Sequence, residues 1–139
     1  MKNIFFVVAF IFMSVASCIS QNIPQVVASA FQIKFPKATN IKWGKENAHE
    51  YEAEFKIDGI DYSANFSGSG EWLETEISFT FDQLPTNVKA AFNSSHKDAK
   101  VKEVAKIETS KGITKYELEI KQGVKTVDIL YNTEGLELK

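Results

Sequence analysis

The chain has 139 residues, of which 44% are hydrophobic and 24% are charged. This length and composition predict one globular domain or two very small ones, with little room for a cofactor-binding fold. Its 16 cationic residues, all of them lysines, nearly balance 18 acidic residues and leave a net charge of -2. The charge balance and the lack of arginine argue against nucleic acid as a partner, because no guanidinium can clamp a phosphate or a guanine.

The first twenty residues have the pattern of an export signal. A lysine precedes an apolar stretch at residues 4–13, which is too short to span a bilayer as a helix. Cleavage after Ser20 would release an exported protein, periplasmic or secreted, that begins at Gln21. Alternatively, residues 15–18 resemble a bacterial lipobox, in which Cys18 is lipidated and anchors the protein in the envelope. The single cysteine is removed or modified in both cases, which excludes disulfides and thiol catalysis.

The remainder of the chain contains two similar segments. Residues 23–31 align with residues 84–92 at an offset of 61, and residues 51–55 align with residues 116–120 at an offset of 65. At the same offset of 65, Gly70 aligns with Gly135. We therefore predict a tandem repeat whose copies together form one structural unit. The predicted divisions are a signal peptide, a first repeat and a second repeat, at residues 1–20, 21–82 and 83–139.

Each copy begins with a helix pattern. Pro24 and Pro85 are expected in the first turn, where a missing backbone N–H costs nothing. Pro36 is expected to end the first helix. Apolar residues follow each of the first two prolines at helical spacing and predict one buried stripe per helix. These residues are Ile23, Val27, Ala30 and Phe31 in the first copy, and Leu84, Val88, Ala91 and Phe92 in the second.

After each helix the apolar period changes to two, which is typical of half-buried strands. In the first copy, Asp58 and Gly59 suit a two-residue type I′ hairpin turn between such strands. The resulting register places all the apolar pairs on one face and one ion pair on the other. The pairs are Ile57 with Ile60, Phe55 with Tyr62, Ala53 with Ala64, Tyr51 with Phe66 and, on the polar face, Lys56 with Asp61.

The second copy predicts a similar hairpin, for which the sequence allows two turns. Its offset pairs Ile120 with Val127, Leu118 with Ile129 and Tyr116 with Tyr131 across a four-residue loop, while a two-residue Gln122-Gly123 loop also keeps one apolar face. Further strands are expected around Ile41 and Trp43 and at residues 72–77, 101–107 and 136–138. The predicted fold class is α+β: each repeat is a helix followed by three to four antiparallel strands. The helices pack on one sheet face and leave the polar face open.

These residues resemble the PepSY-like family of exported Bacteroidetes-type proteins, also described as β-lactamase-inhibitor-like. The resemblance covers nearly the whole mature chain, although Lys97 and Val104 replace Pro36 and Trp43 in the second copy. It implies a fold similar to a β-lactamase inhibitor protein, whose open sheet face is its binding surface, and kinship with PepSY domains, some of which inhibit proteases. It brings no catalytic motif. The segments that carry it are the two Ile/Leu-Pro helix starts, residues 35–43 (FPKATNIKW), 51–55 (YEAEF), 58–59 (DG), 62–66 (YSANF) and 70–74 (GEWLE).

No residue pattern predicts catalysis, a metal site or a cofactor. His49 and His96 lack further ligands at zinc spacing, and the aspartates near the first hairpin turn lack the later ligands of a calcium loop. The alternating glutamates at residues 50, 52 and 54 are interpreted as a charged solvent face rather than as an acid and base pair. We therefore expect a protein that is not an enzyme.

The expected function is binding of an envelope or extracellular protein through the polar sheet face, in the manner of an inhibitor or assembly factor. Membrane contact is expected only if Cys18 is lipidated. Trp72 is a possible anchor residue for the interface. An alternative is a small-ligand or peptide binder that uses the cleft between the two repeats. The predicted binding face comprises Lys42, Glu50, Glu52, Glu54, Lys56, Asp61, Ser63, Asn65, Lys115, Glu117 and Glu119.

Overall fold

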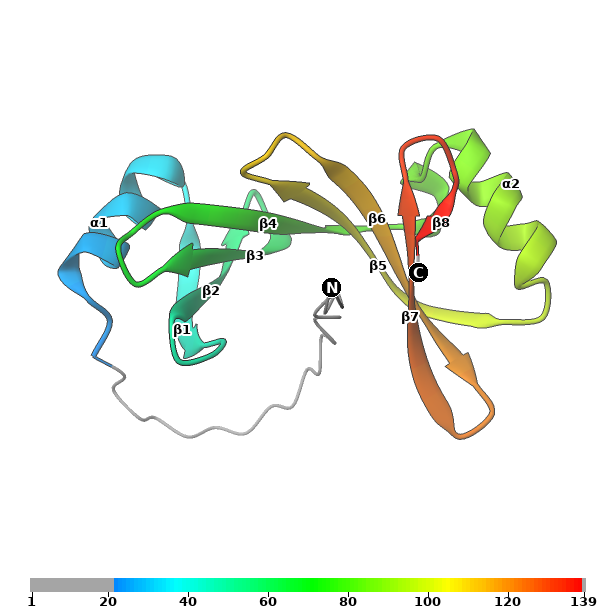
Figure 1. Cartoon of the computed structure of the whole chain (residues 1–139), viewed down its shortest axis with the longest axis horizontal. Coiled ribbons are helices and arrows are strands. Elements are labelled where there is room, and N and C mark those ends of the chain that lie inside the picture. The colour runs from blue at the N-terminus through cyan, green and yellow to red at the C-terminus, as the bar shows by residue number, and fades with distance from the viewer. Residues whose placement is uncertain (1–21, 139) are drawn as a thin grey trace, which may run out of the picture.

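The computed structural model describes residues 22–138, which form one antiparallel sheet and two α-helices. The predicted export signal and the lipidation of Cys18 lie outside these residues. The order of the strands in the sheet is the order of the chain, from β1 to β8. Figure 1 shows helix α1 (Gln25–Lys34) near one end of this long twisted sheet and helix α2 (Thr86–Ser95) near the other.

Four strands follow each helix. A short 3-10 helix, η1 (Phe81–Gln83), lies between β4 and α2. The strands after α1 are β1 (Thr39–Lys45), β2 (Glu50–Ile57), β3 (Ile60–Ser67) and β4 (Trp72–Phe79). The strands after α2 are β5 (Lys100–Thr109), β6 (Thr114–Gln122), β7 (Lys125–Asn132) and β8 (Glu137–Leu138).

Both helices begin immediately after a proline. Pro24 and Pro85 were expected in the first turn, but each is the N-cap residue, with ψ of 136° and 147°. An N-cap residue is extended, and its carbonyl accepts the first helical N–H; that of Pro24 accepts from Ala28 at 3.1 Å. Helix α1 ends at Lys34, and Phe35 is its C-cap. This end agrees with the predicted stop, because the residue before Pro36 is disfavoured in helical conformation.

The first hairpin has the predicted register. Strands β2 and β3 pair Ile57 with Ile60, Phe55 with Tyr62, Ala53 with Ala64 and Tyr51 with Phe66. The turn residues Asp58 and Gly59 have φ of 51° and 82°, as a type I′ turn requires. On the other face, Lys56 Nζ lies 2.6 Å from Asp61 Oδ1.

The second hairpin has a two-residue turn. Strands β6 and β7 pair Ile120 with Val127 and Tyr116 with Tyr131, which is the register predicted from the offset. The strands continue until Gln122 pairs with Lys125, so the turn has two residues, Gly123 and Val124, rather than four. The alternative Gln122-Gly123 loop is therefore wrong.

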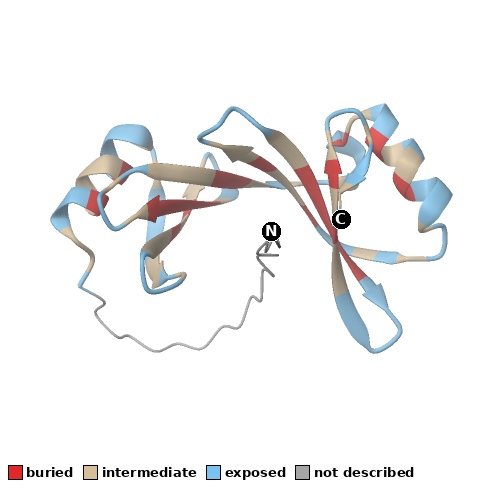
Figure 2. Ribbon diagram, viewed as in Figure 1, coloured by how far each residue is buried: buried red, intermediate tan, exposed pale blue. Residues whose placement is uncertain are grey.

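Two hydrophobic clusters form the core, one beside each helix (Figure 2). Val27 and Phe31 of α1 pack with residues of β2 and β3, and Val88 and Phe92 of α2 pack with residues of β5, β6 and β7. A single row of paired residues crosses the sheet and connects the two clusters on one face, because directly paired residues point to the same side. The row contains Phe55, Tyr62, Ile77, Lys106, Tyr116 and Tyr131.

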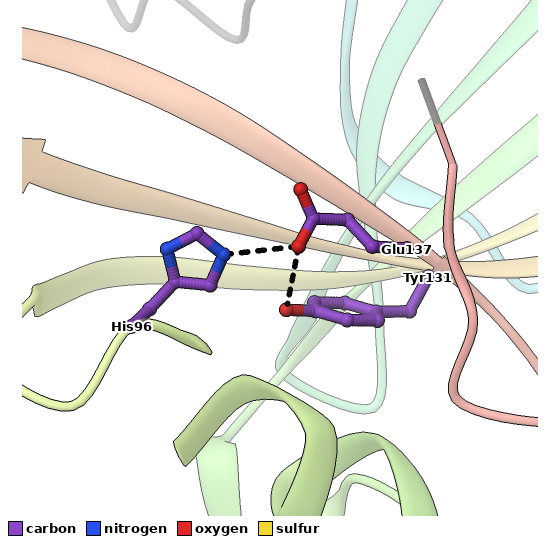
Figure 3. A network of polar contacts seen from close by, with 3 residues as sticks. All are labelled: His96, Tyr131 and Glu137. Carbon is purple, nitrogen blue, oxygen red and sulfur yellow. Dashed lines mark hydrogen bonds and ion pairs between the residues drawn. The ribbon is translucent and has the colours of Figure 1, made fainter. Parts of the chain in front are cut away.

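Polar contacts attach the end of the chain to α2. His96, the C-cap residue of α2, has its Nε2 3.0 Å from Glu137 Oε2 of β8, and the Tyr131 hydroxyl donates to the same oxygen at 3.5 Å (Figure 3). At the other end of α2, the side-chain amide of Asn87 donates to the Thr133 carbonyl at 2.6 Å. Short strand β8 is thus held against the helix as well as against β7.

Candidate functional site: the polar face of the sheet

The face opposite the hydrophobic clusters carries the predicted binding residues. Their shared placement follows from the strand register, in which one row runs across the sheet from β1 to β7. The row contains Lys42, Glu54, Ser63, Glu76, Ile107, Lys115 and Asn132. Every other predicted residue of the binding face lies two or four positions along a strand from a member of this row, so its side chain points to the same side of the sheet. The structure therefore places the predicted set on one face, which we call the polar face.

The polar face is less open than expected. Ser63, Asn65, Glu117 and Glu119 were expected to be solvated, but they are only 4%, 6%, 6% and 9% exposed. They lie on inner strands β3 and β6, each of which has a paired strand on both sides. Lys42 and Asp61 are exposed, and the other predicted residues of this face are half-buried. The face that was expected to be open is therefore only partly exposed to solvent.

Several acidic residues of this face were missed in the sequence. Glu74 and Glu76 alternate along β4 and pair with Asn65 and Ser63 of β3. Glu103 of β5 and Asp128 of β7 flank Glu119, with which both are paired. The alternation of glutamates within residues 72–79 could have revealed the first two, because it has the same period as the glutamates of β2.

A groove of about 630 Å³ crosses the polar face between β2 and β6. Its position follows from small residues: Ser78 pairs with Ala105, and Ala105 pairs with Glu117, so little side-chain volume rises above β5 at this point. Carboxyl groups of the polar face line it together with aromatic residues that also pack against the two hydrophobic clusters. The acidic lining residues are Glu54, Asp61, Glu76, Glu103, Glu117 and Glu119, and the aromatic ones are Tyr62, Phe79 and Phe81.

A second hollow of about 570 Å³ lies farther along the polar face. Its lining includes Glu50, Asn65 and Lys115 of the predicted set, together with Glu74. Lys115 is the basic neighbour that partly offsets the rise in the pKa of Glu74, which burial raises. This hollow therefore carries mixed charge, whereas the first groove is predominantly acidic.

Burial shifts the titration of the acidic residues in and beside the groove. It raises the pKa of Glu76 to about 9, and the nearby Glu117 and Glu74 raise it as well. Burial likewise raises the pKa of Glu117 to about 8, with Asp128 and Glu119 adding to the effect. The pKa of Glu52 rises to about 7 for the same reason. Glu76 and Glu117 are therefore mostly protonated at neutral pH, and their carboxyl groups can donate as well as accept hydrogen bonds.

The hydrogen bonding of the groove is incomplete within residues 22–138. Lys102 Nζ lies 3.0 Å from Glu119 Oε1 and partly offsets the negative charge. Glu76 Oε2, Asn65 Oδ1 and Asp128 Oδ1 are buried and have no hydrogen-bond partner among the described residues. Buried polar atoms are rarely left without a partner, and those that are require an explanation. Glu76 is the member of this group that lines the groove.

Contacts with other residues of the chain partly cover Trp72. The residue is half-buried and packs against the cluster beside α1. Its indole N–H donates to Thr75 Oγ1 at 2.9 Å, and Lys34 Nζ lies 3.5 Å from a ring centroid. One face of the ring is therefore occupied by a residue of this chain. Its role as an interface anchor stays a prediction.

Within residues 22–138, no group of three or more His, Cys, Asp and Glu side chains could hold a metal ion. His96 contacts Glu137 instead, as described above. No helix in the same range is long and apolar enough to cross a membrane.

Within the described residues, eight antiparallel strands and two α-helices define an α+β protein. The family model described as "Putative beta-lactamase-inhibitor-like, PepSY-like" matches residues 49–138. Because the match extends over more than half of the chain, this protein belongs to the PepSY-like family, as the sequence resemblance indicated. A comparison with curated proteins found no match.

Solved structures with the same fold come from several Bacteroides species. A BLIP-like protein from Bacteroides fragilis is 29% identical with a TM-score of 0.71, and the match covers 83% of this chain and 82% of that one. A DUF2874 family protein from Bacteroides ovatus is 26% identical with a TM-score of 0.76, and the match covers 84% of both chains. A "putative periplasmic" protein from Bacteroides eggerthii is 24% identical with a TM-score of 0.78, covering 84% and 86%, and shows the fold alone.

Proposed function

We propose that this chain is an exported, non-enzymatic protein that binds another protein of the envelope or extracellular space through the polar face. The observation that carries the proposal is the groove, which is lined both by Glu76, with its unpaired buried carboxyl oxygen, and by half-buried aromatic side chains. Interfaces combine such partly apolar pockets with a polar rim. The inhibitor-like description of the family supports a binding role over catalysis.

Export is part of the same proposal. The support is the signal-like pattern of residues 1–20. The protein then acts in the periplasm, outside the cell or, if Cys18 is lipidated, at a membrane surface. Radiolabelled fatty acid incorporated by the wild type but not by Cys18→Ser would establish lipidation, and incorporation by neither would indicate cleavage without an anchor.

We further propose that the fold is a duplication. Two close approaches support it: a Cβ on Gly70 would lie 3.0 Å from the Val26 carbonyl oxygen of α1, and one on Gly135 would lie 2.8 Å from the Asn87 carbonyl oxygen of α2. Gly70 and Gly135 align at the offset of 65, and Val26 and Asn87 at the offset of 61. The two copies thus have the same backbone contact between a turn and a helix.

Affinity capture from solubilised envelope tests the proposed binding face. The bait is residues 21–139, which include every described residue, and the variant is Glu54→Lys. Glu54 lines the groove and is half-buried, whereas Glu52 is a poorer choice because its pKa of about 7 indicates that reversing its charge would disturb the fold. Glu71→Lys, at an exposed turn, is the matched control.

A protein retained by the wild type and by Glu71→Lys, but lost with Glu54→Lys, would support the proposed face. A partner retained equally by all three baits would show that binding uses another surface. Absence of any retained protein, with all three baits folded, would contradict the proposal.

A small-ligand or peptide site is the second candidate function. The observation that favours it is the position of the groove, which is lined by residues of both predicted repeats, from Glu54 to Phe81 and from Val101 to Glu119. Pockets commonly form at such junctions. A metabolite that raises the melting temperature of the wild type but not of Ala105→Leu, which fills the groove, would support this candidate.

A further inference from the structure

We propose that the groove receives a basic side chain of a partner polypeptide, with its cationic end group at the carboxyls of Glu76 and Glu117 and its aliphatic stem against Phe79 and Phe81. This inference rests on the proposed function and names the chemistry of the partner. It commits to a lysine or arginine within a peptide segment rather than to a free cation.

The first argument is the unpaired oxygen of Glu76. The residue is 5% exposed, it lines the groove, and its Oε2 has no hydrogen-bond partner among residues 22–138. A buried carboxyl without a partner carries a desolvation cost, which a donor from outside the chain would offset. Ammonium and guanidinium groups are the strongest such donors, because the positive charge of the donor makes the hydrogen bond charge-assisted even before the carboxyl loses its proton.

The second argument is the charge around Glu76. Glu117 is the strongest charged neighbour acting on it, followed by Glu74, Glu52 and Glu46, and all of them are acidic. The basic residue among the groove-lining side chains is Lys102, which is already paired with Glu119. A bound cation favours the ionised form of a neighbouring carboxyl, so its binding displaces the protons that Glu76 and Glu117 carry at neutral pH, whereas an anionic ligand would disfavour ionisation further.

The third argument is the shape and composition of the groove. The gap above Ala105 of β5 lies between β4, which carries Glu76, and β6, which carries Glu117. Phe79 and Phe81 pack against the cluster beside α2, but both are only half-buried, and they line the same groove with apolar surface. Lysine and arginine combine a long apolar stem with a charged end group, so they match a site with apolar and acidic parts. A hydrated divalent cation has no apolar part that would pack against the aromatic surface.

Hexapeptide pools test the proposal directly. In each pool the third residue is arginine, lysine, citrulline, glutamine or glutamate, and the other positions are randomised among neutral residues. Citrulline is the neutral counterpart of arginine, with nearly the same shape. Amide shifts of Glu76, Ser78, Ala105 and Glu117 in NMR spectra of the isotope-labelled protein report occupancy of the groove.

The arginine and lysine pools should shift these amides and bind at least about tenfold more tightly than the citrulline and glutamine pools, because the charge-assisted contact is lost in the neutral peptides. Glu76→Gln keeps the shape of the protonated side chain and should weaken the arginine pool by about tenfold while leaving the citrulline pool unchanged. Glu71→Gln, at the exposed turn, should change neither.

Equal binding of the arginine and citrulline pools, or an unchanged arginine affinity in Glu76→Gln, would overturn the proposal. So would calcium chloride causing the same shifts in the absence of peptide, because the groove would then be a cation site. If only neutral or acidic pools shift the polar face, the basic chemistry is wrong while binding through this face stands. Failure of the proposed function itself is read separately, from the Glu54→Lys capture.

Discussion

Replacing Glu76 with glutamine should change how the free energy of unfolding depends on pH. In the native protein the pKa of Glu76 is about 9, whereas its ordinary value, expected when the chain unfolds, is 4.5. A native pKa above the unfolded value means that the stabilising contribution is complete below about pH 4.5 and is lost as the pH rises toward the native pKa. Glutamine cannot ionise, and it retains the shape of the protonated carboxyl.

The magnitude follows from the slope of this loss. Each pH unit between the unfolded and native pKa values costs up to about 1.4 kcal/mol for one group. Between pH 5 and pH 7, ionisation of Glu76 in the unfolded state therefore lowers the stability of the wild type by up to about 3 kcal/mol. The stability of Glu76→Gln relative to the wild type should rise by that amount over this range, which is about 10 °C in melting temperature for a domain of this size.

Urea denaturation at half-unit intervals from pH 4.5 to 8 measures the difference. The difference between variant and wild type isolates the effect of Glu76, because Glu52 and Glu117 make the free energy of unfolding fall with rising pH in both proteins. A difference between Glu76→Gln and the wild type that stays constant from pH 5 to 7 would refute the assignment of a buried, protonated carboxyl at this position.

Three further predictions concern the fold and the groove. Gly135→Ala should lower the free energy of unfolding by about 2 kcal/mol or more, because the residue has a positive φ and its new Cβ would clash with α2. Gly123→Ala, which has open space around it, should lower the free energy of unfolding by less. Equal decreases for the two variants in urea titrations would contradict this reasoning. Phe31→Ala should cost about 3 to 5 kcal/mol by leaving a cavity, against little change for the exposed Ile33→Ala, in the same titrations. Ala105→Leu should abolish shifts caused by the arginine pool while the variant remains folded by circular dichroism, and persistence of those shifts would place the peptide elsewhere.

The hairpins could be predicted because their signals are local. The alternation of apolar residues in β2 and β3 and the Asp58-Gly59 turn point to the same register, and the register leads directly to the ion pair between Lys56 and Asp61. The turn of the second hairpin was ambiguous for the same physical reason: two loop lengths preserve the alternation, and Gln122-Gly123 is no stronger a turn signal than Gly123-Val124.

The groove could not be predicted, because it depends on contacts between residues far apart in the chain. Glu76 becomes buried through the pairing of β4 with β5, which lie on either side of α2 in the sequence. Nothing local to residues 72–79 sets the neighbour of that strand. The gap above Ala105 likewise requires the registers of β4, β5 and β6 together, and sequence alternation alone does not specify them.

The strand order has a consequence for how the groove comes into existence. Within residues 22–138, consecutive strands of the chain pair with each other, so each hairpin can close with a short loop and a small loss of chain entropy. The β4–β5 pair is different, because the segment between its strands includes η1 and α2. The two ends of the protein can thus acquire structure independently, but the groove forms only when this central pair closes. A partner bound there would contact both halves and would thereby stabilise the closed β4–β5 pair.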